Sequence, residues 1–147
     1  DKEDYASLYS VVCHELAHAS HFAQVGTGYW NKYIRYILES YLKTGDAYGD
    51  GLSADAGYCG VGESWAYYLE SMMYKERYGG SVPTFGSSYW FYPQIFRYLD
   101  ERGLTRSDIF SVLEGNIASK TDLKSALIRN FPQKRTVIEQ VFSRYGN

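Results

Sequence analysis

The chain has 147 residues, 45% of them hydrophobic and 18% aromatic, which is enough to bury one core and predicts a single domain, not a disordered chain. A formal net charge of −2 offers no basic surface for phosphate groups, so nucleic acid is not an expected partner. No apolar run approaches the roughly 18 residues that a membrane span needs.

The apolar pattern predicts a mainly α-helical domain over residues 1–147, with little or no β-sheet. Long helices are expected at residues 5–25, 30–43 and 62–78, and the third ends at a pair of glycines. A glycine-rich loop with three aspartates joins the second helix to the third. It lacks the D-x-D-x-D-G order of a calcium loop, so we expect it to be solvated.

Helical signals continue through the C-terminal half, residues 80–147. The segment 81–90 is expected to be irregular or a short strand, and its aromatic residues are expected to be core or to line a substrate pocket. Four shorter helical segments follow Pro93. Two of them begin with capping-box spacing, with aspartate in place of the usual glutamate, at Thr105 with Asp108 and at Ser119 with Asp122.

The first predicted helix has two contrasting faces. One is an apolar stripe at helical spacing, which is expected to be core and consists of Leu8, Val12, Leu16, Ala19 and Ala23. The opposite face carries all three histidines of the protein, His14, His18 and His21. The other faces are also largely apolar, so this helix is expected to lie at the centre of the fold.

The segment HELAH, residues 14–18, has the spacing of a metal chelate. Residues four apart on a helix lie one turn apart and about 40° around the axis, so His14 and His18 can share one ion. Two buried imidazoles without a shared partner would be costly, and a cation supplies that partner. Glu15 falls beside the ion, where the general base for a metal-bound water has to sit.

Zinc held by two histidines needs at least one more protein ligand. His21 rises about 7 Å beyond the midpoint of the pair on an unbroken helix, so we expect it to be a second-layer or pocket residue. Glu63 is the preferred third ligand, with Asp55, Glu70 and Glu39 as alternatives.

The third predicted helix supports the choice of Glu63. One of its faces is an apolar stripe expected to pack into the core, formed by Trp65, Leu69 and Met72. The opposite face, expected to meet the histidines, carries Glu63, Tyr67, Glu70 and Tyr74. Ala66 is small enough to let the two helices approach closely.

The segment VCHELAHASHF, followed about 45 residues later by GESWAYYLE, resembles the gluzincin branch of zinc metallopeptidases. The resemblance covers roughly residues 11 to 70. It implies that His14, His18 and Glu63 bind Zn²⁺ and that Glu15 is the catalytic base. Many gluzincins have an aspartate where this chain has Tyr67, and a substrate-gripping β-sheet before the motif. We therefore expect support for the zinc ligands from elsewhere, and an N-terminal region beyond this chain or another way of holding substrate.

The expected function is zinc-dependent cleavage of a peptide or protein substrate. Glu15 would move the proton, and a tyrosine or arginine would stabilise the oxyanion, because no histidine follows residue 21. Tyr67 is the first choice for that donor, with Tyr58 and Tyr92 as alternatives.

Three other functions remain open at this point. A catalytically silent zinc-binding module would not require Glu15, and a metal-free helical interaction domain would require none of the site. A di-iron carboxylate bundle would need a second E-x-x-H segment, which the chain lacks.

The two cysteines and the overall composition bear on the redox state and the cellular setting. Cys13 and Cys59 could form a disulfide if the two metal-ligand regions meet, or could be two buried thiols. Richness in tyrosine and low charge favour a secreted or cell-envelope setting over the cytoplasm.

Overall fold

The computed structural model describes residues 2–145, in which seven α-helices and one short 3-10 turn are formed and no strand occurs. The predicted mainly α-helical fold is confirmed. The elements are α1 (Lys2–Val25), α2 (Thr27–Thr44), α3 (Ala56–Tyr78), α4 (Pro93–Glu101), α5 (Arg106–Val112), α6 (Lys120–Asn130), η1 (Pro132–Lys134) and α7 (Arg135–Tyr145). None of these helices combines the length and the apolarity that crossing a membrane requires.

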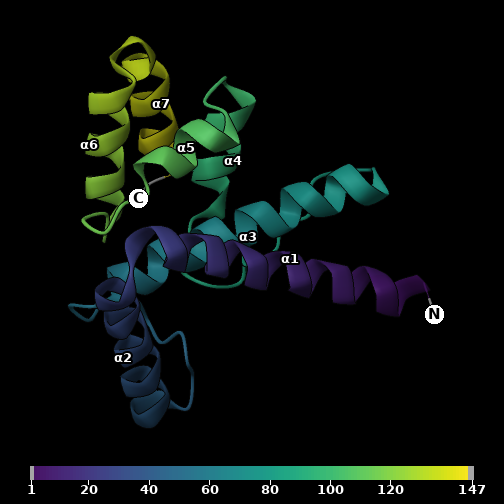
Figure 1. The fold of residues 1–147 in the computed structure, drawn as a ribbon, viewed down its shortest axis with the longest axis vertical. Coiled ribbons are helices and arrows are strands. Elements are labelled where there is room, and N and C mark those ends of the chain that lie inside the picture. The colour runs from purple at the N-terminus through teal and green to yellow at the C-terminus, as the bar shows by residue number, and fades with distance from the viewer. Residues whose placement is uncertain (1, 146–147) are drawn as a thin grey trace.

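Helix α3 runs through the middle of the fold and touches both halves of the chain. Helix α1 lies along α3, and α2 packs against the first part of α3 (Figure 1). Helix α4 packs against α3 and, with α5, α6 and α7, forms a C-terminal cluster. The main core lies between α3 and that cluster, where Trp65 of α3 meets fully buried side chains such as Leu99 and Ile109. Burying one such aliphatic side chain contributes about 1.5–3 kcal/mol to folding.

Helix α3 begins at Ala56, earlier than the predicted start at residue 62. Gly57 and Gly60 suggested a loop, but another part of the chain packs closely against each of them. A Cβ on Gly57 would be 1.8 Å from the carbonyl oxygen of Ala118, and one on Gly60 would be 2.7 Å from the ring of Trp90. Tight packing around the first turns therefore outweighs the low helix propensity of glycine, about 1 kcal/mol per residue.

The predicted caps of the two C-terminal segments are present. Thr105 and Asp108 form a complete capping box: the amide of Asp108 donates to Thr105 Oγ1 at 3.1 Å, and the amide of Thr105 donates to Asp108 Oδ2 at 2.9 Å. Ser119 accepts from the amide of Asp122 at 3.0 Å, but the Asp122 carboxylate accepts from the amide of Ala118 instead. Between α3 and α4, the segment 81–90 is irregular and contains no strand.

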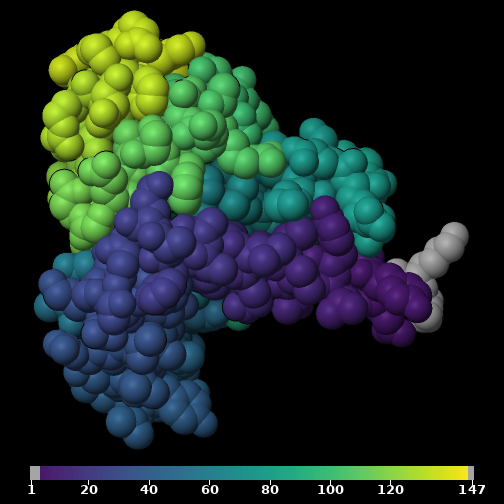
Figure 2. Space-filling model, viewed as in Figure 1, coloured from purple at the N-terminus to yellow at the C-terminus, as the bar shows by residue number. Residues whose placement is uncertain are grey.

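The prediction that the apolar stripe of α1 is core is wrong. Leu8 is 59% exposed, Val12 45% and Leu16 61%, and Ala19 and Ala23 are exposed as well. Figure 2 shows α1 lying uncovered along one face of the molecule. Helix α1 instead buries its histidine side against α3, because that side meets the carboxylates of α3 and carries small residues that allow close contact. The buried residues on this side are Ser10, Cys13, His14, Ala17 and His21.

Candidate metal centre

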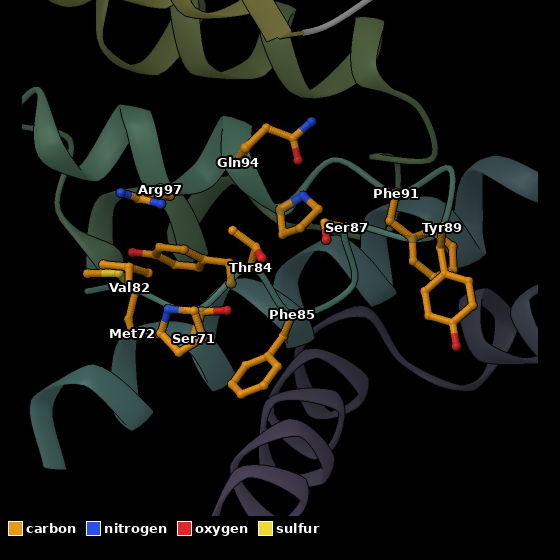
Figure 3. A pocket seen from close by; sticks show the side chains of 13 residues that line it. Ser71, Met72, Val82, Thr84, Phe85, Ser87, Tyr89, Phe91, Gln94 and Arg97 are labelled. Atoms are coloured by element: carbon orange, nitrogen blue, oxygen red, sulfur yellow. The ribbon is translucent and has the colours of Figure 1, made fainter. Parts of the chain in front are cut away.

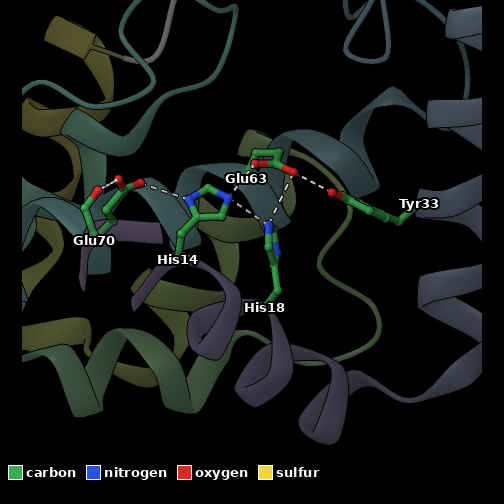
Figure 4. A network of polar contacts seen from close by, with 6 residues as sticks. His14, His18, Tyr33, Glu63 and Glu70 are labelled. Atoms are coloured by element: carbon green, nitrogen blue, oxygen red, sulfur yellow. Dashed lines mark hydrogen bonds and ion pairs between the residues drawn. The ribbon is translucent and has the colours of Figure 1, made fainter. Parts of the chain in front are cut away.

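His14, His18 and Glu63 converge on one point between α1 and α3. Their ligand atoms all lie within 4.8 Å of one another. The Nε2 atoms of the two histidines are 3.1 Å apart; Nε2 of His14 is 3.3 Å from Glu63 Oε2, and Nε2 of His18 is 3.3 Å from Glu63 Oε1 (Figure 4). Two imidazoles and one carboxylate in this arrangement can hold a metal ion.

The helical repeat and the close approach of two helices build this arrangement. His14 and His18 project from successive turns of α1, and Glu63 projects from α3 across the contact. Ala17 and Ala66 are at most 2% exposed at this contact, and their small side chains let the two backbones approach. The predicted convergence of the three residues is therefore present in the fold.

The alternative third ligands lie elsewhere. Oδ2 of Asp55 lies 3.9 Å from Nη1 of Arg35, and Glu39 is exposed on α2. Glu70 contacts His14, but on Nδ1 at 3.0 Å and not on the nitrogen that faces Glu63.

Glu70 and Ser10 fix the orientation of His14. Oε2 of Glu70 accepts a hydrogen bond from Nδ1 of His14 at 3.0 Å, and the hydroxyl of Ser10 donates to Oε1 of Glu70. Because Nδ1 carries the hydrogen, the lone pair of a neutral His14 is on Nε2, toward Glu63. The support that the resemblance places at residue 67 thus comes from Glu70, two helical turns after Glu63. That spacing on one face of α3 was the signal in the sequence that could have identified it.

Tyr33 of α2 is a further member of the site, and the sequence did not indicate it. Its hydroxyl donates to Oε1 of Glu63 (Figure 4). Burial, together with the charge and hydrogen bond of Glu63, raises the pKa of Tyr33, so the phenol stays protonated and remains a donor. No motif near residue 33 signals this contact, since it depends on how α2 packs against α3.

Charge pairing dominates the electrostatics of the site. Burial by itself would lower the pKa of His14, but its contacts with Glu63 and Glu70 and their negative charges raise it to about 9. Burial by itself would raise the pKa of Glu63, but its contacts with His14 and His18 and the hydrogen bond from Tyr33 lower it to about 2. The site is thus arranged to hold positive charge beside Glu63.

Two buried atoms of the site have no hydrogen bond in the described part of the chain, namely Oε2 of Glu63 and Nδ1 of His18. Oε2 of Glu63 forms an ion pair with Nε2 of His14 at 3.3 Å, beside the point where the three residues meet. A divalent cation there would bind this oxygen and both Nε2 atoms, which agrees with the fit of the donor set to a metal.

His21 lies outside the group. It is fully buried and packs against Tyr29 and Trp30, at ring distances of 5.1 and 6.0 Å, and neither of its ring nitrogens has a hydrogen-bond partner among the described residues. Burial and the nearby charge of His18 lower its pKa to about 4, so it is neutral at pH 7. Its role is one of packing beside the site.

Of the two residues predicted to be catalytic, one follows His14 in sequence and the other packs on its ring. Glu15 is exposed on α1, next to His14. The ring of Tyr67 lies 4.5 Å from the ring of His14 at 65°, and burial raises the pKa of Tyr67 to about 12, so it too remains a donor. The alternatives Tyr58 and Tyr92 have other contacts. The hydroxyl of Tyr58 accepts a hydrogen bond from Lys32, and Tyr92 is buried in the main core.

A cavity of about 320 Å³ lies between α3, the loop before α4, and α4 (Figure 3). Its walls are mostly apolar, with Gln94 and Arg97 among its polar groups. Tyr89 and Phe91 line it and stack on Tyr67, at ring distances of 6.1 and 6.0 Å. Aromatic residues of the segment before α4 therefore serve both as packing and as cavity wall.

Cys13 and Cys59 are both buried and free, so the structure holds two thiols and no disulfide between them. Burial raises the pKa of Cys59, which favours its protonated, unreactive form.

Comparison of the chain with protein-family models, with curated proteins and with solved structures finds no match in any of the three.

Proposed function

We propose that this protein is a zinc-dependent hydrolase that cleaves peptide bonds. The observation that carries the proposal is the cluster of His14, His18 and Glu63, whose ligand atoms lie within 4.8 Å of one another; Glu15 follows His14 directly in sequence and is exposed. A purely structural zinc site would not require a free carboxylate at that position. The order of these residues along the chain resembles the gluzincin peptidases.

His14, His18 and Glu63 would hold the zinc ion, which would supply an acidic water molecule and polarise the scissile carbonyl. Glu15 is the proposed general base: it would accept a proton from the attacking water and give it to the leaving amide nitrogen, so that hydrolysis yields a carboxylic acid and an amine. His14 is kept in the binding tautomer by Glu70. Tyr67, whose ring packs on His14, is the proposed donor to the developing oxyanion.

The choice of zinc over other divalent ions follows from the ligand types. Two imidazole nitrogens with one carboxylate oxygen are the ligand set of catalytic zinc in many hydrolases, whereas calcium and magnesium prefer oxygen ligands throughout. A di-iron centre would need further carboxylates at the same point. Among the described residues, Glu63 is the one carboxylate that joins the two histidines there.

The test combines metal content with turnover. Purified protein is expected to hold about one zinc per chain. Glu15→Gln should keep the metal and lose about 10²–10⁴-fold in the rate of cleavage of a labelled, unfolded casein. Glu63→Ala should lose most of the metal. Glu39→Gln, which changes an exposed glutamate away from the site, serves as the matched control and should behave as the unmodified protein.

Each part of the proposal has its own failing outcome. Absence of bound zinc in the unmodified protein would refute the metal site. Full zinc content without any turnover of casein or other unfolded protein would leave a silent zinc-binding module as the function. Undiminished turnover in Glu15→Gln would remove Glu15 from the mechanism.

A further inference from the structure

The two oxygens of Glu63 have different surroundings. Oε1 accepts the hydroxyl hydrogen of Tyr33 and lies 3.3 Å from Nε2 of His18. Oε2 is buried, has no hydrogen bond among the described residues, and forms an ion pair with Nε2 of His14 at 3.3 Å. Oε1 is thus engaged by a neutral hydroxyl donor, whereas Oε2 has no such donor.

Tyr33 is held firmly in place by its neighbours. Its ring packs against Trp30 at 4.4 Å and against His18 at 5.9 Å. On the third side its ring comes close to Gly62, where a Cβ would be 3.6 Å away. These contacts fix the ring, so the hydroxyl stays on Oε1 of Glu63 and does not follow small movements of the carboxylate.

We propose that Tyr33 is a positioning residue that makes Glu63 bind the metal through Oε2 alone. This inference rests on the proposed function, because it assumes an ion bound by His14, His18 and Glu63. A hydrogen bond to one carboxylate oxygen lowers its electron density and competes with a second metal–oxygen bond. Glu63 therefore takes up one coordination position, and a fourth position stays open for water and substrate.

The same contact excludes a second role for Tyr33. A phenol has one hydrogen, and that of Tyr33 is given to Glu63. Tyr33 is therefore not free to donate to an oxyanion, and that role is left to Tyr67. The structure separates the two tyrosines by function: Tyr33 arranges the ligand, and Tyr67 faces His14.

The decisive measurement is the visible spectrum of the protein loaded with cobalt(II) in place of zinc. Four-coordinate cobalt absorbs intensely in the visible range, and five-coordinate cobalt absorbs weakly. The unmodified protein should show the intense bands. Tyr33→Phe keeps the ring but lets Glu63 bind through both oxygens, so these bands should be lost while about one cobalt per chain is still bound.

Tyr36→Phe is the matched control. Tyr36 lies one turn further along α2, is buried, and donates its hydroxyl to the carbonyl oxygen of Tyr48, away from the metal site. It loses a buried tyrosine hydroxyl in the same way, and its cobalt spectrum should match that of the unmodified protein. Circular dichroism of both variants reports whether they are folded.

The outcomes separate the inference from the proposed function. If the unmodified protein binds neither zinc nor cobalt, the proposed metal site fails. If it binds cobalt and Tyr33→Phe leaves the intense bands unchanged, the role of Tyr33 is refuted and the metal site stands. Should Tyr33→Phe fail to fold, X-ray absorption of the zinc-loaded unmodified protein decides: a carboxylate bound through two oxygens would overturn the inference.

Discussion

Nδ1 of His14 lies 3.0 Å from Oε2 of Glu70, and this contact determines which nitrogen of His14 faces Glu63. Glu70 comes from the same face of α3 as Glu63, so one helix both supplies Glu63 to the cluster and orients His14. The hydroxyl of Ser10 holds the second oxygen of Glu70, which completes a chain from α1 to α3 and back to the histidine.

Replacing Glu70 by glutamine should weaken zinc binding about 10–100-fold, because the negative charge that increases the basicity of His14 is lost and an amide oxygen is a weaker acceptor. Competition with a coloured zinc chelator measures the change. Glu39→Gln removes an exposed carboxylate of α2 and should leave the affinity unchanged. Equal affinities for the Glu70 and Glu39 variants would show that the contact does not support the metal.

Zinc binding at neutral pH should release about one proton from His14. In the metal-free protein the carboxylates of Glu63 and Glu70 raise the pKa of His14 to about 9, so its Nε2 is protonated at pH 7 and must lose that proton to bind an ion. Glu63, with a pKa of about 2, is already ionised and releases none. Calorimetric titration with zinc in two buffers of different ionisation enthalpy gives the number. Release by His14 should fall away as the pH rises past about 9, and its absence at pH 7 contradicts the charge state inferred for His14.

His21 should make the metal-free protein lose stability in mild acid. Its pKa is about 4 in the folded chain and near the ordinary 6.5 when unfolded, so only the unfolded chain takes up this proton at intermediate pH. The stabilisation is fully present above about pH 6.5 and is lost as the pH falls toward 4, by roughly 3 kcal/mol in total.

His21→Leu is the variant that isolates this effect. Urea unfolding at about pH 6.5 and about pH 4.5 should show a smaller loss of unfolding free energy for the variant than for the unmodified protein. Equal losses in the two proteins would mean that His21 is not buried in its neutral form.

Gly57→Ala should destabilise the fold by about 3 kcal/mol, because the new methyl group meets the carbonyl oxygen of Ala118 at 1.8 Å and a backbone must move. Gly28→Ala is the control within α2, where an added Cβ has no atom within 4 Å. That substitution should be neutral or should stabilise the protein by up to about 1 kcal/mol. Urea unfolding compares the two, and equal stabilities would show that α3 does not approach Ala118 so closely.

The three residues that could hold a metal ion could be predicted from sequence because each follows from local periodicity. Four-residue spacing brings His14 and His18 together on any helix, and the apolar stripe around Trp65 predicts which side of α3 carries Glu63. The main helices follow for the same reason. These patterns lie within single helices, whereas the meeting of Glu63 with the two histidines depends on the packing of α1 against α3.

The features that the sequence did not indicate all depend on tertiary contact. The sequence pattern of α1 shows two faces but not which one α3 covers, and the prediction chose the larger apolar side chains such as Leu16. The hydroxyl of Tyr33 reaches Glu63 from a helix with no motif. The early start of α3 at Ala56 depends on neighbours that approach its glycines from distant parts of the chain.

The two sides of helix α3 make different contacts: Glu63 contacts the histidines, and Trp65 packs into the main core with the C-terminal helices. An ion bound by the histidines and Glu63 would therefore be attached to the helix that the main core packs against. Binding of the ion should raise the melting temperature of the whole chain in one cooperative transition. The reason is that α4 packs against α3, the helix that carries Glu63, and links it to the other C-terminal helices.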